Sequence, residues 1–320
     1  MTRTEWAAAG ITDPGLRGSY RCCRELNARH GKTFFLATRL LAPDQRPAVH
    51  ALYGFARRAD DILDDLDPTR TVDERAAGLD ALAQQFAARD SGGDPVLAAV
   101  LDTAARYAID GHLFDAFLAS MRMDLTVTDY PDRAALDRYV YGSAEVIGLQ
   151  LLPILGTVDA EAAPYAAALG KAFQLTNFLR DVDEDLARDR VYLPADELAA
   201  HGVDRDLLEW CAKHRRVQPR VRAALAAQHE ITREIYEDAR GGIERLAPRS
   251  RPCVTTALTL YSEILDRIED DDFEIFGRRV SVGTGRRVRV GTAGLVRAWL
   301  ARRGPASNHG RSPDNSRART

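Results

Sequence analysis

Apolar residues recur three or four positions apart through most of the chain, which is the spacing that gathers them on one face of an α-helix. The pattern predicts helices over residues 18–30, 44–66, 71–90, 95–109, 111–127, 132–156, 159–187, 196–213, 218–246 and 251–271. Turn-forming residues separate these segments, and no alternating run is long enough to form a sheet. Since no break resembles a long linker, the sequence predicts an all-α fold in a single domain.

Ionic side chains are distributed unevenly along the 320 residues. Residues 278–320 contain eleven Arg and one acidic residue, Asp314, so this segment has a net charge of +10. Because the formal net charge of the chain is −3, residues 1–277 carry −13. The sequence from residue 304 onwards has a composition typical of disorder. We expect no nucleic-acid partner, because electrostatic binding needs a positive face and the body is acidic.

Signals of export or of membrane insertion are absent from the sequence. No stretch approaches the roughly 20 apolar residues of a membrane-spanning helix. The first residues show no basic flank followed by an apolar core. The cysteines form no CxxC spacing and are expected to be reduced thiols: Cys22, Cys23, Cys211 and Cys253. We therefore expect a cytoplasmic, globular protein.

The first informative motif lies within residues 53–65, YGFARRADDILDD. On a helix Asp60 and Asp64 share a face, Tyr53 and Arg57 lie on roughly that face, and a second aspartate pair follows one residue later. The apolar residues between them indicate a largely buried helix. Four carboxylates within two turns repel one another, and desolvation increases the repulsion, so something cationic must compensate them.

A second motif lies within residues 173–194, FQLTNFLRDVDEDLARDRVYLP. Here Gln174, Asn177, Asp181 and Asp185 form a single polar line along a helix whose other sides are apolar. Acidic stripes are often solvated helix faces, but two matching clusters in apolar helices favour a divalent-cation site. Mg²⁺ prefers oxygen ligands and is usually held by one or two carboxylates together with substrate phosphates. Carboxylates from facing helices of a bundle can form such a site.

Other metal and nucleotide sites are disfavoured by the motifs. The sequence contains no HExxH, and its seven His residues are scattered, which argues against zinc or a di-iron centre. It contains neither a GxxxxGKS/T nor a GxGxxG loop, so nucleotide binding through those loops is not expected.

With both motifs in this order, the sequence resembles the squalene/phytoene synthase family of head-to-head prenyl synthases, and bacterial phytoene synthases most closely. The resemblance runs from about Leu16 to Val280. It extends to HGKTFFLAT (30–38), MRMDLTVTDY (121–130), YVYGSAEVIG (139–148) and YSEILDRIEDDDFEIFGRR (261–279). The segment YVYGSAEVIG departs from the family pattern at Ser143 and at Glu145, which replaces a glycine. This carboxylate is expected either to face away from the cavity or to pair with a buried Arg.

The fold implied by the resemblance is an isoprenoid-synthase-type helical bundle with a central active-site cavity. The implied catalytic domain spans residues 16–280, with an N-terminal extension at 1–15 and a basic, largely disordered tail at 281–320. Candidates to line the apolar part of the cavity are Phe34, Tyr53, Tyr139, Ile147, Leu151, Phe173 and Leu175.

Roles for individual residues are also implied by the resemblance. Mg²⁺, or Mn²⁺ in its place, is expected to bind Asp60, Asp64, Asn177, Asp181 and Asp185. Catalytic roles are expected for the four aspartates, Tyr53 and Arg57. The substrate is expected to contact Lys32, Thr33, Phe34, Arg57, Tyr139, Gln174, Asn177, Tyr261 and Arg278.

The implied activity joins two geranylgeranyl diphosphates through a cyclopropylcarbinyl diphosphate to give phytoene and diphosphate, in carotenoid biosynthesis and without NADPH. Two alternatives stay open. A relative that uses farnesyl diphosphate would make squalene, dehydrosqualene or a hydroxylated squalene precursor, and the sequence does not reveal the cavity depth that sets chain length. A non-catalytic homologue that acts in assembly would be expected to have lost the metal-binding aspartates. The sequence indicates neither partner proteins, nor the oligomeric state, nor the double-bond geometry of the product.

Contact with a membrane is expected because the implied substrates and product are lipids. Residues 295–303, LVRAWLARR, predict a short basic amphipathic helix with Leu295, Trp299 and Leu300 on one side. Basic side chains are attracted to anionic lipid surfaces. We therefore expect peripheral contact at the inner face of the membrane, made by the C-terminal tail.

Overall fold

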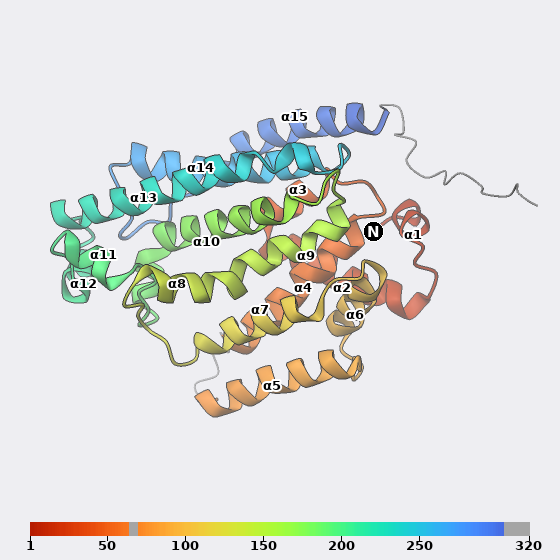
Figure 1. Ribbon diagram of the computed structural model, residues 1–320, viewed down its shortest axis with the longest axis horizontal. Helices are drawn as coiled ribbons and strands as arrows, with labels where there is room; N and C mark the ends of the chain where they lie inside the picture. Colours follow the sequence, from red (N-terminus) through yellow and green to blue (C-terminus); the bar gives the residue numbers. More distant parts are fainter. Residues whose placement is uncertain (64–69, 304–320) are drawn as a thin grey trace, which may run out of the picture.

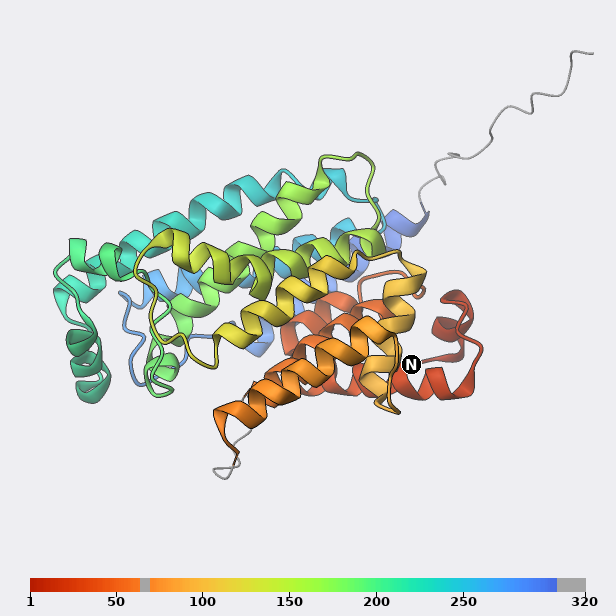
Figure 2. The same cartoon turned by 60° about the horizontal axis from the view of Figure 1, so that its bottom comes forward.

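Helices form the framework of the protein, as the apolar periodicity predicts. The computed structural model describes residues 1–63 and 70–303. Within these ranges no β-strand forms, and the only backbone bridges are isolated ones between Asp129 and Val191 and between Thr157 and Leu246. The long helices of the bundle lie roughly side by side (Figures 1 and 2), and in Figure 1 α15 runs along one edge and α5 along the opposite edge. The predicted all-α fold is confirmed.

In chain order the α-helices are α1 (Arg3–Ala8), α2 (Pro14–His30), α3 (Lys32–Thr38), α4 (Arg46–Leu63), α5 (Val72–Ala88), α6 (Pro95–Arg106), α7 (Gly111–Met123), α8 (Arg133–Val140), α9 (Val146–Leu155), α10 (Ala162–Leu186), α11 (Ala195–Ala200), α12 (Arg205–His214), α13 (Pro219–Arg240), α14 (Arg251–Asp270) and α15 (Thr284–Arg303). A π-helical turn (Tyr141–Glu145) joins α8 to α9, and a 3₁₀ turn (Ile243–Arg245) follows α13.

Side-chain caps determine where many of these helices begin. An Asp or Thr side chain accepts a backbone N–H at the start of α1, α2, α5, α6, α7, α8 and α12. At α5, Thr71 and Glu74 form a reciprocal capping box. At α6, Asp94 is the cap and Pro95 follows it, at a position where the missing N–H would have no partner in any case. Each such cap stabilises its helix by on the order of 1 kcal/mol.

The two helices that carry the acidic motifs are positioned by a shared neighbour. Helix α10 packs against α9, the π-helical turn, α13 and α14, whereas α4 packs against α2, α6 and α9. Apolar side chains anchor both helices in separate buried clusters, for example Phe55 of α4 and Leu179 of α10. Because α9 contacts both, it links α4 to α10 within the bundle.

The helix predicted over 132–156 consists instead of α8, the π-helical turn and α9. A Cβ at Gly142 would lie 2.2 Å from the Ala116 carbonyl oxygen on α7, and a Cβ at Gly148 would lie 2.2 Å from the Ala166 carbonyl oxygen on α10. Only glycine permits such close backbone approach. The π-helical turn therefore occurs where this segment packs closely against α7 and α10. Apolar periodicity does not encode that packing.

Some short elements also differ from the prediction. Helices α1 and α3 have six and seven residues, too few for the apolar repeat to predict. The helix predicted over 196–213 is two helices, α11 and α12, because Gly202 adopts a left-handed φ of +67° directly after the end of α11.

Both terminal segments pack more closely on the body than expected. Within residues 1–15, Trp6 and Ile11 are buried in an apolar cluster with Tyr20 of α2. The helix expected over 295–303 is confirmed but begins at Thr284, so the glycine-containing segment before it is helical rather than disordered. Packing of α15 against α14 and α3 outweighs the low helix propensity of its glycines. Residues 304–320 lie outside the described part of the chain.

Candidate active site

A long apolar cavity of about 310 Å³ lies inside the bundle. One face of α10 forms much of its wall, from Ala162 to Asn177, a distance of about 22 Å along the helix axis. The lining residues predicted from the sequence include five that are present in this wall: Phe34, Tyr53, Ile147, Leu151 and Phe173. The expected central cavity is therefore confirmed.

Two of the predicted lining residues lie elsewhere, which corrects the expectation. Tyr139 is buried, and its hydroxyl donates a hydrogen bond to Asp124 Oδ2 at 2.7 Å, away from the apolar wall. Leu175 belongs to the same buried cluster as Tyr139. Leu175 directly follows Gln174, which does line the cavity, and consecutive residues of a helix point about 100° apart. The two side chains therefore face different neighbours.

A polar pocket of about 290 Å³ adjoins the apolar cavity. Gln174 and Asn177 line both spaces, so these two amides mark the boundary between a charged compartment and an apolar one. The other residues of the polar wall are Asp60, Leu63, Asp124, Phe178, Arg180, Asp181, Asp185, Arg188, Arg190 and Tyr192.

Three of the four predicted metal-binding aspartates meet in this polar pocket. Asp60 comes from α4, and Asp181 and Asp185 come from α10. The fourth, Asp64, lies outside the described residues. Burial, together with the negative charge of Asp181, raises the pKa of Asp185 to about 7. These carboxylates therefore disfavour each other's charged form, and a bound cation would relieve the repulsion.

The carboxylate and amide oxygens of the polar pocket are ligands that suit a hard divalent cation. Asn177 Oδ1 is buried and accepts no hydrogen bond from the described residues, so an oxygen is available beside the aspartates. Asp181 accepts from Arg180 Nε at 2.7 Å and from Arg279 Nη2 at 2.9 Å. Within residues 1–63 and 70–303, no three His, Cys, Asp or Glu side chains lie close enough to hold a metal alone. Such an incomplete set of oxygens suits Mg²⁺, whose shell substrate phosphates and water usually complete.

Three arginines of the polar wall were not singled out by the sequence analysis. All three lie within the second acidic motif, residues 173–194: Arg180, Arg188 and Arg190. Arg190 Nη2 donates to the backbone carbonyl oxygen of Asp124 at 2.7 Å, which fixes its guanidinium at the pocket. The sequence signal that could have identified these arginines is their position next to the acidic residues of the motif. In the structure they place fixed positive charge beside the aspartates of the polar pocket.

The arginine predicted from the C-terminal motif is not the one that reaches the pocket. Arg278 has a side chain that is 59% exposed and pairs with Asp271. Its neighbour Arg279 pairs with Asp181 at 2.9 Å. Both lie in a non-helical segment, where consecutive side chains point to different sides, and the motif alone does not fix which one turns inwards.

Four further residues predicted to contact the substrate line neither the apolar cavity nor the polar pocket: Lys32, Thr33, Arg57 and Tyr261. Lys32 is exposed at the start of α3, and Thr33 is partly buried beside it. Arg57 pairs with Asp61 on the next turn of α4 at 2.5 Å, and its buried Nε has no hydrogen-bond partner among the described residues. Arg57 therefore pairs with another residue of the first motif and does not line the polar pocket.

Tyr261 lines neither the apolar cavity nor the polar pocket, but its buried ring packs on two aromatic residues of the cavity wall. The centroid of the Tyr261 ring lies 5.1 Å from that of Phe34 and 4.4 Å from that of Phe173. Burial raises the pKa of Tyr261, and burial also raises the pKa of Tyr53 to about 12, so both hydroxyls are neutral. Gly31 makes room for the Tyr53 ring, because a Cβ at Gly31 would lie 2.7 Å from Tyr53 Cε2.

A hydrogen-bonded group around Asp124 forms the opposite side of the polar pocket. Its carboxylate accepts from the hydroxyls of Tyr139 at 2.7 Å and Tyr192 at 3.0 Å. The Tyr192 ring stacks on Phe178 with a centroid distance of 4.2 Å. Burial raises the pKa of Tyr139, which keeps its hydroxyl a donor. Tyr139 therefore supports the pocket through Asp124, a role that the sequence did not indicate.

Glu145 does not enter the cavity, although its neighbours Ser143 and Ala144 line it. Burial raises the pKa of Glu145, and the positive charge of Lys171 opposes that shift. Lys171 Nζ itself pairs with Asp137 Oδ1 at 2.7 Å. Of the two alternatives for this departure from the family pattern, the structure supports a carboxylate that faces away from the cavity.

Known proteins share both the sequence pattern and the architecture. The model of the squalene/phytoene synthase family matches residues 27–286. The chain belongs to the squalene/phytoene synthase family. Among its relatives, a phytoene synthase of Arthrospira platensis is 36% identical over 282 residues, which cover 83% of this chain and 89% of that protein. A 15-cis-phytoene synthase of Synechococcus elongatus is 35% identical over 286 residues, which cover 84% of this chain and 90% of that protein.

Solved structures of the family have the same helical arrangement. A dehydrosqualene synthase crystallised with a ligand superposes with a TM-score of 0.78 at 27% identity, covering 89% of this chain and 97% of that one. Among the helices described for this chain, none is both long enough and apolar enough to cross a bilayer.

Proposed function

We propose that the protein is a phytoene synthase, which joins two geranylgeranyl diphosphates head-to-head and releases phytoene, two diphosphates and a proton, in carotenoid biosynthesis. The observation that carries this proposal is the junction of a charged pocket with a long apolar cavity at Gln174 and Asn177. An allylic diphosphate has a charged head and a hydrocarbon tail, which match these two compartments. Relatives that are 36% and 35% identical over most of the chain are named phytoene synthases.

The polar pocket is the proposed site of Mg²⁺, which Mn²⁺ could replace. The protein ligands would be Asp60, Asp181, Asp185 and Asn177, which lie in its wall, and Asp64, which the first motif predicts. A cation bound there acts as a Lewis acid and neutralises charge on the leaving diphosphate. Arg180, Arg188 and Arg190 supply guanidinium donors whose geometry suits phosphate oxygens.

The apolar cavity protects the cation that remains after diphosphate leaves. Water would quench an allylic cation, so a wall of aliphatic and aromatic side chains is needed around it. The ring faces of Phe34 and Phe173 lie in that wall and can stabilise positive charge. Phytoene formation ends in loss of a proton, which requires no NADPH.

The main alternative is a synthase that uses farnesyl diphosphate, and one observation keeps it open. The dehydrosqualene synthase that superposes at a TM-score of 0.78 shows that relatives with another name have nearly the same fold. Fold alone therefore does not select between a C15 and a C20 substrate.

Product identification decides between these activities. Purified protein is incubated with Mg²⁺ and either geranylgeranyl or farnesyl diphosphate, with and without NADPH, and the products are analysed by mass spectrometry. We expect a C40 triene from geranylgeranyl diphosphate without NADPH. A product from farnesyl diphosphate alone would replace the proposal by the alternative, and no product from either substrate would favour a non-catalytic homologue.

The proposed reaction also needs exchange with a membrane, because its substrates and product are lipids. We place the protein in the cytoplasm with peripheral contact at a membrane surface.

A further inference from the structure

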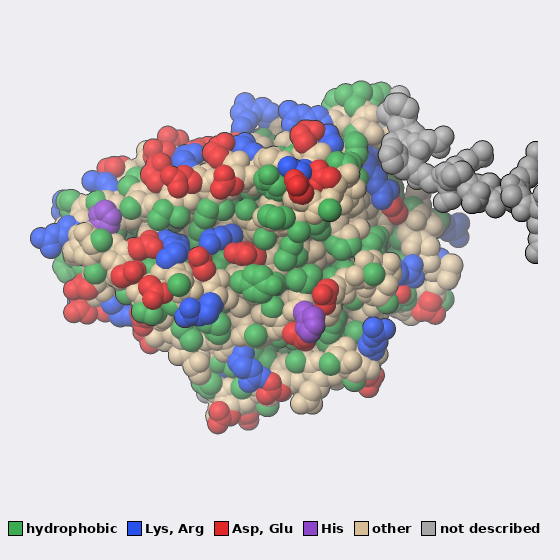
Figure 3. All heavy atoms as spheres, viewed as in Figure 1, with side chains coloured by type: hydrophobic (Ala, Val, Ile, Leu, Met, Phe, Trp, Pro, Cys, Tyr) green, Lys and Arg blue, Asp and Glu red, His purple; other side chains and the backbone are tan. Residues whose placement is uncertain are grey.

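The outer face of α15 gathers exposed apolar side chains. Nine large apolar side chains are exposed in the part of the chain that the structure describes, and five of them belong to this one helix: Val288, Leu295, Val296, Trp299 and Leu300. Figure 3 shows an apolar area at the top of the molecule, over the C-terminal half of α15, and basic side chains over its N-terminal half. Concentration of apolar surface on one element is typical of an interaction site.

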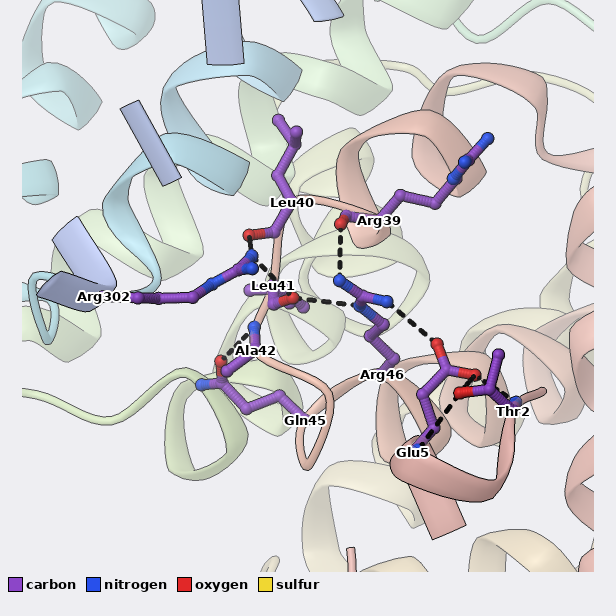
Figure 4. A network of polar contacts seen from close by, with 9 residues as sticks. All are labelled: Thr2, Glu5, Arg39, Leu40, Leu41, Ala42, Gln45, Arg46 and Arg302. Atoms are coloured by element: carbon purple, nitrogen blue, oxygen red, sulfur yellow. Dashed lines mark hydrogen bonds and ion pairs between the residues drawn. The ribbon is translucent and has the colours of Figure 1, made fainter. Parts of the chain in front are cut away.

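The opposite face of α15 is docked on the body through small residues. Ala298 is buried, and a Cβ at Gly294 would lie 2.7 Å from Leu40 Cδ1, so the helix lies close to the segment that follows α3. Near the end of the helix, Arg302 Nη2 donates to the carbonyl oxygens of Leu40 at 2.6 Å and Leu41 at 3.1 Å (Figure 4). These contacts fix the rotation of α15 and hold its apolar side chains outwards.

The charge of α15 selects the kind of surface that it can meet. Residues 284–303 contain six Arg and no acidic residue, whereas residues 1–277 carry a net charge of −13. Arg289 and Arg297 are exposed beside the apolar side chains. An anionic lipid surface would therefore attract this helix and repel most of the remaining body, which gives both affinity and orientation.

The position of α15 relates this surface to the cavity. Ala298 packs in one cluster with Leu155, Leu246, Cys253 and Ala257, all of which line the apolar cavity. None of these four lines the polar pocket. The docked face of α15 thus lies behind the hydrocarbon part of the cavity wall.

We propose that α15 docks the protein on an anionic lipid bilayer. Val288, Leu295, Val296, Trp299 and Leu300 enter the boundary between headgroups and acyl chains, and Arg289 and Arg297 contact lipid phosphates. Docking in this orientation places the apolar part of the cavity next to the bilayer. The docking is supported by the surface of α15 alone. That docking helps to deliver a hydrocarbon product to the bilayer rests on the proposed function.

Sedimentation with vesicles tests the docking. The full chain is mixed with vesicles of phosphatidylcholine alone or with added phosphatidylglycerol, and the bound fraction is measured at rising salt concentration. We expect binding to the anionic vesicles that weakens with salt. The substitution Val296→Asp should reduce this binding by about tenfold or more, since a charge then enters the apolar boundary. Val158→Asp is the matched control, because the two valines are 59% and 58% exposed and only the first lies on α15.

The arginines provide a second arm of the same experiment. The double substitution Arg289→Gln and Arg297→Gln should lower binding to anionic vesicles and reduce its salt dependence, with no change in the melting temperature. Equal binding of the Val296→Asp and Val158→Asp proteins would overturn the proposal. So would a dimer of the full chain that Val296→Asp converts to a monomer, since the face would then belong to a second copy of the chain.

Activity on detergent-dispersed substrate separates this inference from the proposed function. The proteins with substitutions on α15 should keep their metal-dependent turnover in detergent while losing vesicle binding. If vesicle binding follows the expected pattern but no substrate is turned over, the docking stands and the proposed function fails.

Discussion

The Asn27–His50 pair shows how a buried polar group in this protein is held in one charge state. Asn27 is fully buried and lines the apolar cavity, and its Nδ2 lies 3.0 Å from His50 Nδ1. Burial lowers the pKa of His50 to about 3, so the imidazole is neutral near pH 7. A neutral ring that accepts from the amide at Nδ1 carries its proton at Nε2. The pair therefore fixes an amide in the cavity wall without adding charge to it.

This arrangement predicts a loss of stability in acid. An unfolded histidine binds a proton below about pH 6.5, whereas folded His50 does not until about pH 3, so its contribution is present above pH 6.5 and is lost as the pH falls through that window. The free energy of unfolding should fall by up to about 1.4 kcal/mol per pH unit more steeply than in the His50→Gln protein. Urea unfolding at several pH values measures the two slopes, and parallel slopes would contradict the assignment.

Single aspartates of the polar pocket are expected to be essential for metal binding. Asp60→Asn should lower kcat/KM by about 100-fold or more, as expected for a direct metal ligand. Mg²⁺ together with inorganic diphosphate should raise the melting temperature of the original protein but not of this variant. Asp189→Asn is the control, because its side chain is 84% exposed and pairs only with Arg205 among described residues. Equal stabilisation of all three proteins by Mg²⁺ would place the metal elsewhere.

The relative position of side chains can be predicted from the sequence where one helix supplies the pattern. Asp181 and Asp185 share a face by periodicity, and the structure places both in the polar pocket. Asp124 was missed because its partner Tyr192 is 68 residues away, and no local spacing encodes that contact. The choice between Arg278 and Arg279 likewise depends on the rotation of a non-helical segment.

Among the secondary-structure elements, the crossing of α9 and α10 depends on glycines. Besides Gly148, a Cβ at Gly170 of α10 would lie 2.4 Å from the carbonyl oxygen of Ala144, in the π-helical turn directly before α9, so the backbones approach closely at two neighbouring points. Both glycines also line the apolar cavity. The shape of the cavity therefore depends on how closely these two helices pack.

Substitution of one glycine should separate the helices. Gly148→Ala places a methyl group 2.2 Å from a backbone oxygen that cannot move alone, so the free energy of unfolding should fall by about 2 kcal/mol or more. Gly111→Ala is the control, because nothing lies within 4 Å of its Cβ position and alanine favours the helix. Thermal unfolding compares the two, and a neutral Gly148→Ala would show that the crossing tolerates a wider spacing.

Apolar periodicity identified most long helices but not the details that tertiary packing decides. Helix α15 begins eleven residues before the predicted position, although Gly285, Gly291 and Gly294 each disfavour a helix by about 1 kcal/mol relative to alanine. Two of these glycines let the helix approach Leu36 and Leu40. Burial against partners distant in sequence thus overrides local propensity, which a single sequence does not reveal.

For the molecule as a whole, the length of the apolar cavity is expected to select the substrate. The wall formed by α10 extends from the polar boundary at Asn177 to Ala162 near the start of the helix. A side chain enlarged at that far position shortens the space left for a hydrocarbon tail. The sequence predicted a cavity but not its depth, because depth depends on how several helices pack together.

Enlarging that position should change chain-length preference. In the Ala162→Phe protein, kcat/KM for geranylgeranyl diphosphate should fall by about tenfold relative to that for farnesyl diphosphate. Ala163→Phe is the control, because the adjacent residue lies outside the cavity wall. Competition assays with both substrates give the ratio directly. An unchanged ratio would mean that the tail does not extend along α10 as far as Ala162.

The meeting of two compartments at Gln174 and Asn177 makes the protein distinguish the two ends of a bound amphiphile. A molecule with a charged head has one favourable register along α10, since any displacement moves that head against apolar side chains or away from its arginines. A hydrocarbon of the same length has no such preferred register and can slide along the wall. Affinity therefore depends most on the group that the proposed reaction removes. The enzyme should hold its substrate more tightly than its product, and turnover itself would then favour release.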